Sequence, residues 1–399
     1  MSTAGEARID WAAGQMPVLR SIGERFARDR PLDNLVVGAC LHVTSETANL
    51  VRVLEAGGAA VALCASNPFA TQADVAAALA ASGTDVQAGE DWAAGVAAVV
   101  ERAPRITLDD GADLLTALHA TRPELLDGVL GGTEETTTGL VRLRALEAEG
   151  RLACPVVAVN EALTERAFND RFGTGQSAID AILRTTNVLL AGRTVVVFGY
   201  GWTGKGVALR AKGLGASVIV CEVDPLRGLE ARMDGFEVMP ALAAAERGDV
   251  FVTVTGGRDV LAREHFERMK DGAVLANAGH FDVEISLEDL RAAGGEPVEV
   301  RPLVQRYDVG GRRLHLLAAG RVVNLAAAEG HPAAVMDISF ALQALAAEDL
   351  ARRGAELAPG VHAVPEELER EVARLKLASL GVEIDSLTDA QLAYLSSWR

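Results

Sequence analysis

The chain has 399 residues, of which 49% are hydrophobic and only 4% aromatic, so it is long enough for two globular domains with aliphatic cores. Its formal net charge of −17 excludes the basic stripe that a nucleic-acid-binding protein needs. No run of residues has the length and apolarity of a membrane span, and the N-terminal residues contain no apolar signal core.

The sequence contains four cysteines, Cys40, Cys64, Cys154 and Cys221. Each lies in or beside an apolar, strand-like run, and no two are spaced as Cys-x-x-Cys. This pattern predicts buried, reduced thiols and therefore a cytoplasmic protein. We expect no metal ion and no membrane or nucleic-acid partner.

The first half of the chain alternates apolar strands with helices. The first ~30 residues predict a helical segment that packs through Ile9, Trp11, Met16 and Leu19. Strands are then predicted at 35–39, 60–64, 106–108, 128–130 and 155–159, and helices at 45–56, from about 72 and at 96–102. This alternation is typical of a parallel sheet.

Polar residues follow the carboxyl ends of these strands. Because ligands of open α/β sheets bind at that edge, these side chains are expected to meet in one binding site. One such residue could be an ordinary helix cap, but five are hard to explain in that way. They are His42, Asn67, Asp110, Glu135 and Asn160.

The second half is organised around a glycine-rich turn. A buried strand at 194–198 leads into Gly199-Tyr200-Gly201-Trp202-Thr203-Gly204 and a helix, and the next strand, 216–221, ends at Glu222. In this order the glycines allow a tight turn, a close approach to a pyrophosphate and close packing of helix on strand. Glu222 can accept hydrogen bonds from both ribose hydroxyls of NAD, while Arg227 leaves an opening for NADP.

The remaining elements complete two doubly wound parallel-sheet domains joined by a hinge, an α/β fold. A helix is expected at 177–190, strands at 250–255 and 273–277, β segments around Gly310-Gly311, and an amphipathic helix from His331 to Arg353. We predict a substrate domain at 1–186 that is completed by 331–360, a Rossmann NAD domain at 187–330 and a helical tail at 361–399. The tail could dock on a neighbouring subunit or pack within its own chain.

Six motifs along nearly the whole chain resemble those of S-adenosylhomocysteine hydrolases, in particular the short form of archaea and some bacteria. They are His42-Val-Thr-x-Glu-Thr, Asp109-Asp-Gly-Ala-Asp, Glu134-Glu-Thr-Thr-Thr-Gly, the glycine triplet, Gly279-His-Phe-Asp-Val-Glu-Ile and Gly330-His-Pro. The resemblance implies tightly bound NAD that is regenerated in each turnover, a nucleoside substrate and a homotetramer. In this family the ribose 3′-hydroxyl is oxidised, C4′ loses a proton, the 5′ thiol is eliminated, water adds and the ketone is reduced again.

The resemblance also implies roles for individual residues. The group around the 5′ carbon comprises His42, Asp110 and His280, and Glu135 and Thr136 bind the ribose. Adenine or ribose is contacted by Thr44 and Glu46, Asn67 lines the same pocket, and His331 closes over the base. The cofactor set comprises Thr137, Thr138, Gly199, Gly201, Trp202, Thr203, Gly204, Glu222, Arg227, Thr255, Asn277 and Asn324.

The chain departs from the family at one place. The family reads Asn-Asp-x-x-Thr-Lys-x-x-Phe-Asp-Asn-x-Tyr-Gly, and its lysine and first aspartate after the phenylalanine handle the ribose and a proton. Here these two positions are Glu165 and Asn169. The change reverses the charge beside the 3′-oxygen unless Glu165 is itself the base, and Asn169 cannot accept a proton. Asp170 could take over part of the role, although neighbouring residues of an α-helix point about 100° apart.

Four functions therefore stay open at the level of sequence. The preferred interpretation is a nucleoside dehydratase that removes water from a 5′-hydroxy nucleoside to give a 4′,5′-ene, as in a pathway to an antibiotic of the angustmycin type. The others are S-adenosylhomocysteine hydrolysis, a catalytically silent NAD-binding regulator, and a dehydrogenase that stops after hydride transfer. The catalytic set is His42, Asp110, Glu135, Glu165, Asn169, Asp170 and His280.

Overall fold

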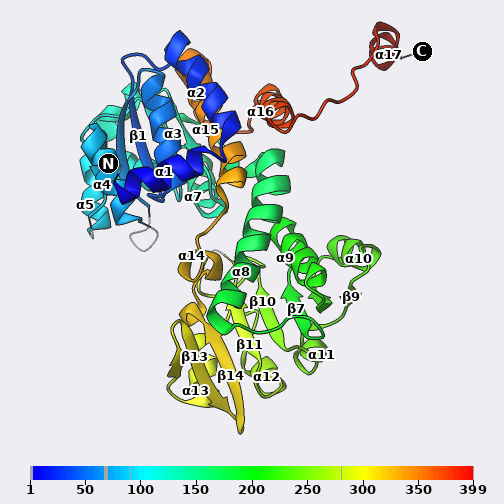
Figure 1. Ribbon diagram of the computed structural model, residues 1–399. Helices are drawn as coiled ribbons and strands as arrows, with labels where there is room; N and C mark the ends of the chain where they lie inside the picture. Colours follow the sequence, from blue (N-terminus) through cyan, green and yellow to red (C-terminus); the bar gives the residue numbers. More distant parts are fainter. Residues whose placement is uncertain (1–2, 67–70, 90, 280, 399) are drawn as a thin grey trace.

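The computed structural model describes residues 3–66, 71–89, 91–279 and 281–398 and has two β-sheets, each flanked by helices (Figure 1). The first sheet has the strand order β15-β6-β5-β4-β1-β2-β3, and every pairing in it is parallel. Its strands are β1 (Val36–Leu41), β2 (Ala60–Ala65), β3 (Asp85–Gln87), β4 (Ile106–Asp109), β5 (Gly131–Glu134), β6 (Pro155–Val157) and β15 (Gly360–His362).

The second sheet has the order β12-β13-β14-β11-β10-β7-β8-β9 and is parallel from β14 to β9. An antiparallel pair of hairpins, β12-β13-β14, ends it at one edge. Its strands are β7 (Thr194–Phe198), β8 (Ser217–Cys221), β9 (Glu237–Val238), β10 (Val250–Thr253), β11 (Val274–Asn277), β12 (Val298–Arg301), β13 (Val304–Val309) and β14 (Arg312–Leu317).

Helices connect the strands of each sheet. Those of the first half are α1 (Ala4–Ala13), α2 (Pro17–Asp29), α3 (Ser45–Ala56), α4 (Ala73–Ser82), α5 (Trp92–Val100), α6 (Asp113–Thr121), the 3₁₀-helix η2 (Pro123–Gly128) and α7 (Thr137–Ala148). Those around the second sheet are α9 (Trp202–Gly213), α10 (Pro225–Met233), α11 (Ala241–Ala245), α12 (Arg263–Phe266) and α13 (Leu287–Gly294).

The two sheets share one topology. In each, the chain starts at a central strand, winds outwards on one side, and returns to continue on the other side, so the order reverses between β1 and β4 and between β7 and β10. At such a reversal the loops leave in opposite directions and open a crevice at the carboxyl ends of the strands. The two crevices are the parts of the fold where ligands are expected.

Two stretches of chain connect the sheets. From β6 the chain passes through η3 (Val159–Glu161), the π-helix η4 (Glu165–Thr174) and α8 (Gly175–Thr186) to β7. From β14 it returns through η5 (Ala318–Gly320), α14 (Val323–Ala326), α15 (Ala333–Arg353) and η6 (Gly354–Glu356) to β15. The return confirms that the helix after His331 rejoins the first sheet.

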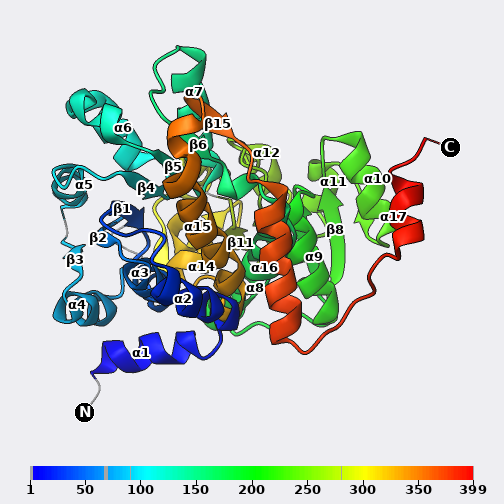
Figure 2. The ribbon, with the colours of Figure 1, turned by 90° about the horizontal axis from the view of Figure 1, so that it is seen from above.

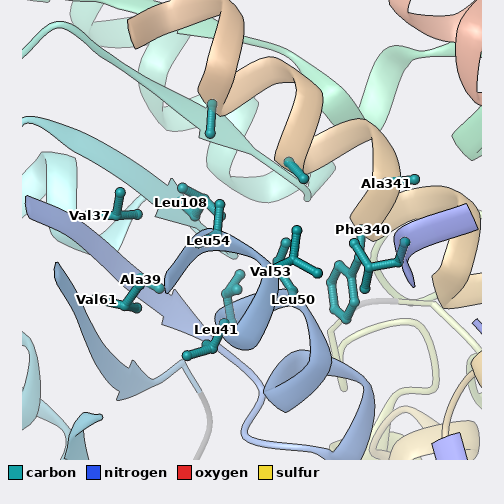
Figure 3. Packing of buried hydrophobic residues seen from close by; sticks show 14 of the residues in the cluster. Val37, Ala39, Leu41, Leu50, Val53, Leu54, Val61, Leu108, Phe340 and Ala341 are labelled. Atoms are coloured by element: carbon teal, nitrogen blue, oxygen red, sulfur yellow. The ribbon is translucent and has the colours of Figure 1, made fainter. Parts of the chain in front are cut away.

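Helix α15 is a central core element of the first half. Figure 3 shows Phe340 and Ala341 of α15 beside aliphatic side chains of α3, with the strand residues of β1, β2 and β4 nearby. Every residue from 337 to 350 is buried. The expectation of an amphipathic helix is therefore wrong, because α2, α3, α16 and β5 all pack around this helix.

Two other expectations are wrong for local reasons. Trp11 is 77% exposed, because α1 buries the stripe formed by Gly5, Ile9 and Ala12 instead. The strand expected at 128–130 begins at Gly131, after the 3₁₀ turn η2. A side chain at Gly131 would come within 2.7 Å of Leu350 of α15, so this strand begins with glycine and lacks an apolar pattern.

The tail consists of α16 (Glu366–Ser379) and α17 (Asp389–Leu395). Helix α16 packs on α15 and α2, so this part of the tail lies within its own chain (Figure 2). Helix α17 has no buried residue and stands apart at the end of an extended segment (Figure 1). The described residues contain no helix that is both long and apolar enough to span a membrane. The four cysteines are free and buried, as expected.

Asp337 ties three helices together. Its carboxylate accepts hydrogen bonds from the backbone N–H groups of Val18 and Leu19 at the start of α2 and from Lys376 Nζ of α16 at 2.8 Å. The Asp337 side chain is 0% exposed. It therefore satisfies free N–H groups of one helix and the charge of another.

Asp337→Ala should lower the free energy of unfolding by about 3–5 kcal/mol, because it leaves the half-buried Lys376 ammonium and two helix N–H groups without their acceptor. Thermal or urea unfolding measures the change. Asp33→Ala, which removes an exposed ion pair with Arg30, is the matched control and should cost under about 1 kcal/mol. Equal losses for the two variants would contradict the role given to Asp337.

Candidate functional site

A cavity of about 810 Å³ lies where the carboxyl ends of the two sheets face each other. Residues that follow strands of the first sheet line it together with residues that follow strands of the second. Of the residues predicted from the sequence, it brings together His42, Thr44, Glu46, Asp110, Glu135, Thr136, Thr137, Thr138, Asn160, Glu165, Asn169, Asp170, Thr203, Thr255, Asn324 and His331. Asn67 and His280 lie outside the described residues.

His42 and Asp110 form a pair at the reversal point of the first sheet. His42 follows β1 and Asp110 follows β4, and His42 Nε2 lies 3.3 Å from Asp110 Oδ2. Ser66 Oγ contacts His42 Nδ1 at 3.2 Å. A carboxylate and a hydroxyl thus fix both ring nitrogens, which orients the imidazole for proton transfer.

A second layer of acids lies behind this pair, and the sequence analysis missed its role. Asp109 and Glu134 are 0% exposed and face each other on β4 and β5. Asp109 accepts from Leu114 N and Leu115 N at the start of α6. Burial raises the pKa of both carboxyls, and the charge of Asp109 adds to the shift in Glu134.

The doubled acids, Asp109-Asp110 and Glu134-Glu135, are the sequence signal for this layer. Successive side chains of a strand point to opposite faces of the sheet, so the first acid of each pair is buried and the second lines the cavity. Glu134 Oε1 accepts from Gly111 N and Thr136 N, and a side chain at Gly139 would lie 2.1 Å from the Glu134 carboxyl carbon. The buried acids Asp109 and Glu134 therefore fix, through backbone hydrogen bonds, the loops that carry Asp110 and Glu135.

Glu165 and Asn169 lie in contact on the π-helix. Glu165 Oε2 accepts from Asn169 Nδ2 at 2.8 Å and from Ser339 Oγ of α15 at 2.9 Å. Glu165 Oε1 is buried and has no hydrogen-bond partner among the described residues. Burial, as the largest cause, raises the pKa of Glu165 to about 7.

Asp170 lines the same cavity as Glu165 and Asn169, contrary to the expectation that it points away. The expectation assumed α-helical winding, but residues 165–174 form a π-helix, whose i→i+5 bonding winds the chain more widely. Residues four and five positions after Glu165 therefore reach the same cavity. Burial raises the pKa of Asp170 to about 6, and Arg166 opposes this shift.

His331 closes the cavity from the start of the return connection. Its Nε2 lies 2.8 Å from Thr174 Oγ1 at the end of the π-helix. Burial lowers the pKa of His331 to about 4, so the ring is neutral at pH 7. Three histidines outside the cavity, His119, His265 and His362, bond to nearby backbone groups.

The glycine turn has the conformation that its sequence predicts. Gly199 has φ +97°, and a side chain at Gly204 would lie 2.0 Å from Gly199 O. At Gly201, by contrast, an added Cβ would meet only Arg227 Nη1, at 3.8 Å. The turn thus leaves space on its outer side, where the backbone can approach a pyrophosphate at the start of α9.

Glu222 lies beside this turn, outside the cavity. Its carboxylate accepts from Tyr200 N at 2.7 Å and from the N–H groups of Val223 and Asp224. Trp202 lies under Lys205, whose Nζ is 4.8 Å from the ring centre. Arg227 is exposed and lies 3.9 Å from Asp224. The turn and Glu222 thus form one surface that continues into the cavity at Thr203.

Glu284 holds the opposite wall and was missed by the sequence analysis. It is 1% exposed, and its carboxylate accepts from Thr255 N, Thr255 Oγ1 and Gly256 N. Asn324 Oδ1 lines the cavity, buried and without a partner among the described residues. Asn277 is fully buried and bonds to Gly279, Phe281 and Gly320, so it shapes the loop and does not reach the cavity.

These residues fit a dinucleotide. The outer side of the glycine turn offers an open approach to phosphates, Glu222 offers an acid for a ribose, and Asn324 offers an unpaired acceptor on the cavity side. The far end of the cavity carries the His42–Asp110 pair and the acids. A nicotinamide and a polar substrate can therefore meet in one enclosed space.

We predict different outcomes when Gly201 and Gly204 are each changed to alanine. Gly201→Ala should leave the melting temperature unchanged and lower the NAD content of purified protein at least tenfold, because its methyl group projects only into the phosphate approach. Gly204→Ala is the comparison and should lower the melting temperature, since its methyl group clashes with Gly199 O. NAD retention in Gly201→Ala would contradict the placement of the pyrophosphate.

The chain is similar over its whole length to several curated proteins. It is 55% identical to "Adenosylhomocysteinase" of Aquifex aeolicus (strain VF5), covering 100% of this chain and 97% of that protein. It is 51% identical to "S-inosyl-L-homocysteine hydrolase" of Methanocaldococcus jannaschii, covering 99% and 96%. Among solved structures, the A chain of dipicolinate synthase from Bacillus subtilis matches with a TM-score of 0.52 at 14% identity, over 80% of this chain and 98% of that chain. This likeness supports the two-sheet α/β fold alone.

Two family descriptions match separate parts of the chain. Residues 1–124 match "S-adenosyl-L-homocysteine hydrolase", and residues 170–330 match "S-adenosyl-L-homocysteine hydrolase, NAD binding domain". The second match contains the glycine turn, Glu222 and the wall formed by Glu284 and Asn324. The chain therefore belongs to the S-adenosyl-L-homocysteine hydrolase family and is an NAD-dependent enzyme.

Proposed function

We propose that this enzyme hydrolyses the 5′ thioether of an S-nucleosyl-L-homocysteine, with S-adenosyl-L-homocysteine as its substrate. The observation that carries the proposal is the single cavity in which the His42–Asp110 pair of one sheet faces the dinucleotide wall of the other. Full-length identity of 50% or more to relatives named for this hydrolysis supports it. This function takes precedence over the dehydration favoured by the sequence alone.

The residues of the cavity suit a sequence of proton transfers. NAD, when bound, accepts and returns the hydrogen of the ribose C3′ as hydride. We propose that His42 and Asp110, with His280, handle the protons of the 5′ leaving thiol and of the water that replaces it. Neutral His331 can close over the base without adding a charge, and Glu135 and Thr136 bind the ribose hydroxyls.

The purine is selected by a carboxylate in this proposal. Glu46 lines the cavity, and its Oε1 accepts from Ser45 Oγ at 3.0 Å. An acceptor of this kind favours the exocyclic amine of adenine over the 6-oxo group of hypoxanthine. We therefore prefer the adenosyl compound to the inosyl compound named for some relatives.

The same proposal extends to the organisation of the chain. We propose a substrate domain at 1–186 completed by 331–360, a cofactor domain at 187–330 and a tail at 361–399, with a hinge at the two connections. The cofactor contacts would be Thr137, Thr138, Gly199, Gly201, Trp202, Thr203, Gly204, Glu222, Arg227, Thr255 and Asn324, with Asn277 supporting the loop. By family resemblance the enzyme would be a homotetramer, and its buried free thiols suit the reducing cytoplasm.

Water loss from a 5′-hydroxy nucleoside is a second candidate, favoured by one observation. Glu165 and Asn169 stand where the family has a lysine and an aspartate, so the charge beside the sugar is reversed while the rest of the cavity keeps the family residues. A substrate with a different sugar would require different residues at this position. Dehydration would use the same 3′ oxidation and C4′ deprotonation.

Incubation of purified enzyme with S-adenosyl-L-homocysteine should release adenosine and homocysteine, detected by mass spectrometry and a thiol assay. His42→Gln should abolish the release. The proposed hydrolysis is wrong if neither the adenosyl nor the inosyl compound releases a thiol. If a 5′-hydroxy nucleoside then loses water, the enzyme is a dehydratase.

Glu46→Gln should lower kcat/KM for the adenosyl compound relative to the inosyl compound by about tenfold, because an amide can donate to a 6-oxo group and a carboxylate cannot. Paired rate measurements on the two substrates give this ratio. Glu124→Gln, an exposed change outside the cavity, should leave the ratio as in the wild type. An unchanged ratio in Glu46→Gln would remove Glu46 from base selection.

A further inference from the structure

Two buried carboxyl groups reach the cavity with one oxygen each left unpaired. Glu135 Oε1 follows β5 of the first sheet, and Glu165 Oε1 lies on the π-helix. Neither atom has a hydrogen-bond partner among the described residues, and both side chains line the cavity. The side chain of Gln343 on α15 lies near Glu135 and opposes in part the rise that burial causes in its pKa. A buried carboxyl oxygen without a partner is costly when it is charged, so each of these groups is stabilised by a proton or by a polar ligand that donates to it.

The surroundings of Glu165 fix its direction. Asn169 Nδ2 and Ser339 Oγ both bond to Oε2, and Asn169 Nδ2 also contacts Ser339 Oγ at 2.7 Å. This triangle leaves Oε1 as the carboxyl oxygen of Glu165 without a partner among the described residues. Asn169 is thus a positioning residue: it cannot take up a proton, but it holds the carboxyl group that can.

The charges around Glu165 suit proton exchange near neutral pH. The acids that face it are Asp170 of the same helix and Glu369 of α16, and Glu135 lies opposite; Arg166 acts on Asp170. Burial, Asp170 and Glu369 raise the pKa of Glu165 to about 7, and burial and Glu165 raise the pKa of Glu135 well above its usual value. Two carboxyl groups with different pKa values can divide the roles of base and acid.

We propose that Glu165 is the residue that removes and returns the proton of the substrate's 3′-hydroxyl, while protonated Glu135 donates a hydrogen bond to a ribose oxygen. In the oxidation, the O3′–H bond breaks, its proton passes to Glu165 Oε1, the C3′ hydride leaves to NAD and C3′=O forms. The reduction returns the same proton and hydride. This assignment rests on the proposed function, or on dehydration, because both need oxidation at C3′.

This arrangement explains why a lysine and an aspartate could be lost together. A glutamate alone at position 165 would place an unsupported charge against Glu135 and Asp170. With Asn169 as a neutral donor, the Glu165 charge gains a hydrogen bond instead of a third acidic neighbour. The pair therefore acts as one unit, and the cavity keeps a proton acceptor at the sugar.

The first test is the half-reaction with adenosine, followed by the absorbance of the reduced dinucleotide in the holoenzyme. Glu165→Gln should slow this step about 10²–10⁴-fold, the usual contribution of a general base, and Glu165→Asp should recover part of it. Glu367→Gln, an exposed acid of α16, is the matched control and should behave as wild type. A Glu165→Gln rate equal to wild type overturns the assignment.

The second test needs no turnover. A buried acid with a raised pKa binds its proton more tightly in the folded protein, so its cost to stability appears as the pH rises above about 4.5 and is complete above about 7. Glu165→Gln should therefore raise the melting temperature of the holoenzyme by on the order of 2 °C at about pH 8 and leave it unchanged at about pH 4.5. An equal shift at both pH values overturns the assignment.

The two tests separate the assignment from the proposed function. If the wild type reduces its dinucleotide with adenosine and releases homocysteine, but Glu165→Gln does both at the wild-type rate, Glu165 is not the base and the function stands. If the wild type never reduces its dinucleotide with any nucleoside, the proposed function fails and the assignment fails with it.

Discussion

The functional site depends on one topological constraint: both sheets reverse their strand order at the centre, and the two reversal points face each other. Each reversal opens a crevice at the carboxyl ends of its strands. In the first sheet this crevice carries His42 and Asp110, and in the second it carries the glycine turn and Thr255. Neither crevice alone carries both the His42–Asp110 pair and the glycine turn. The connections through η4 and α15 bring the two edges together.

Enclosing the cavity buries acidic side chains, and burying them lowers the stability of the folded protein. Asp109 and Glu134 are relieved by the backbone N–H groups of the loops that they hold, which is the cheapest way to keep an acid beneath a site. One oxygen each of Glu134, Glu135 and Glu165 is left without a hydrogen-bond partner among the described residues. Buried acids that are only partly satisfied at a functional site indicate selection for chemistry at the expense of stability.

Most of the fold could be predicted from the sequence because both sheets are built from short apolar runs between glycine and polar turns. The helix at 45–56 and the strand at 194–198 have the expected bounds. The errors occurred where packing overrides pattern. Gly131 begins a strand with no apolar signal because α15 lies against it, and α15 is buried over most of its length because helices and strands surround it.

Only those residues of the site that belong to recognisable sequence motifs could be predicted. His42, Asp110 and Glu135 could be expected to converge because they follow parallel strands. Ser339 and Glu284 could not, since each is distant in sequence from the groups that it orients and carries no motif of its own. The π-helix that brings Asp170 into the cavity could not be predicted either, because the sequence pattern was interpreted with α-helical winding.

We propose that the ribose of the substrate is oxidised at C3′, so that its C4′ hydrogen becomes labile. Incubation of adenosine with the holoenzyme in D₂O, followed by NMR and mass analysis of the recovered nucleoside, tests this directly. We predict that deuterium appears at C4′ and at no other carbon of the sugar. Recovery of adenosine without deuterium, from enzyme that cleaves its thioether substrate, would contradict the account.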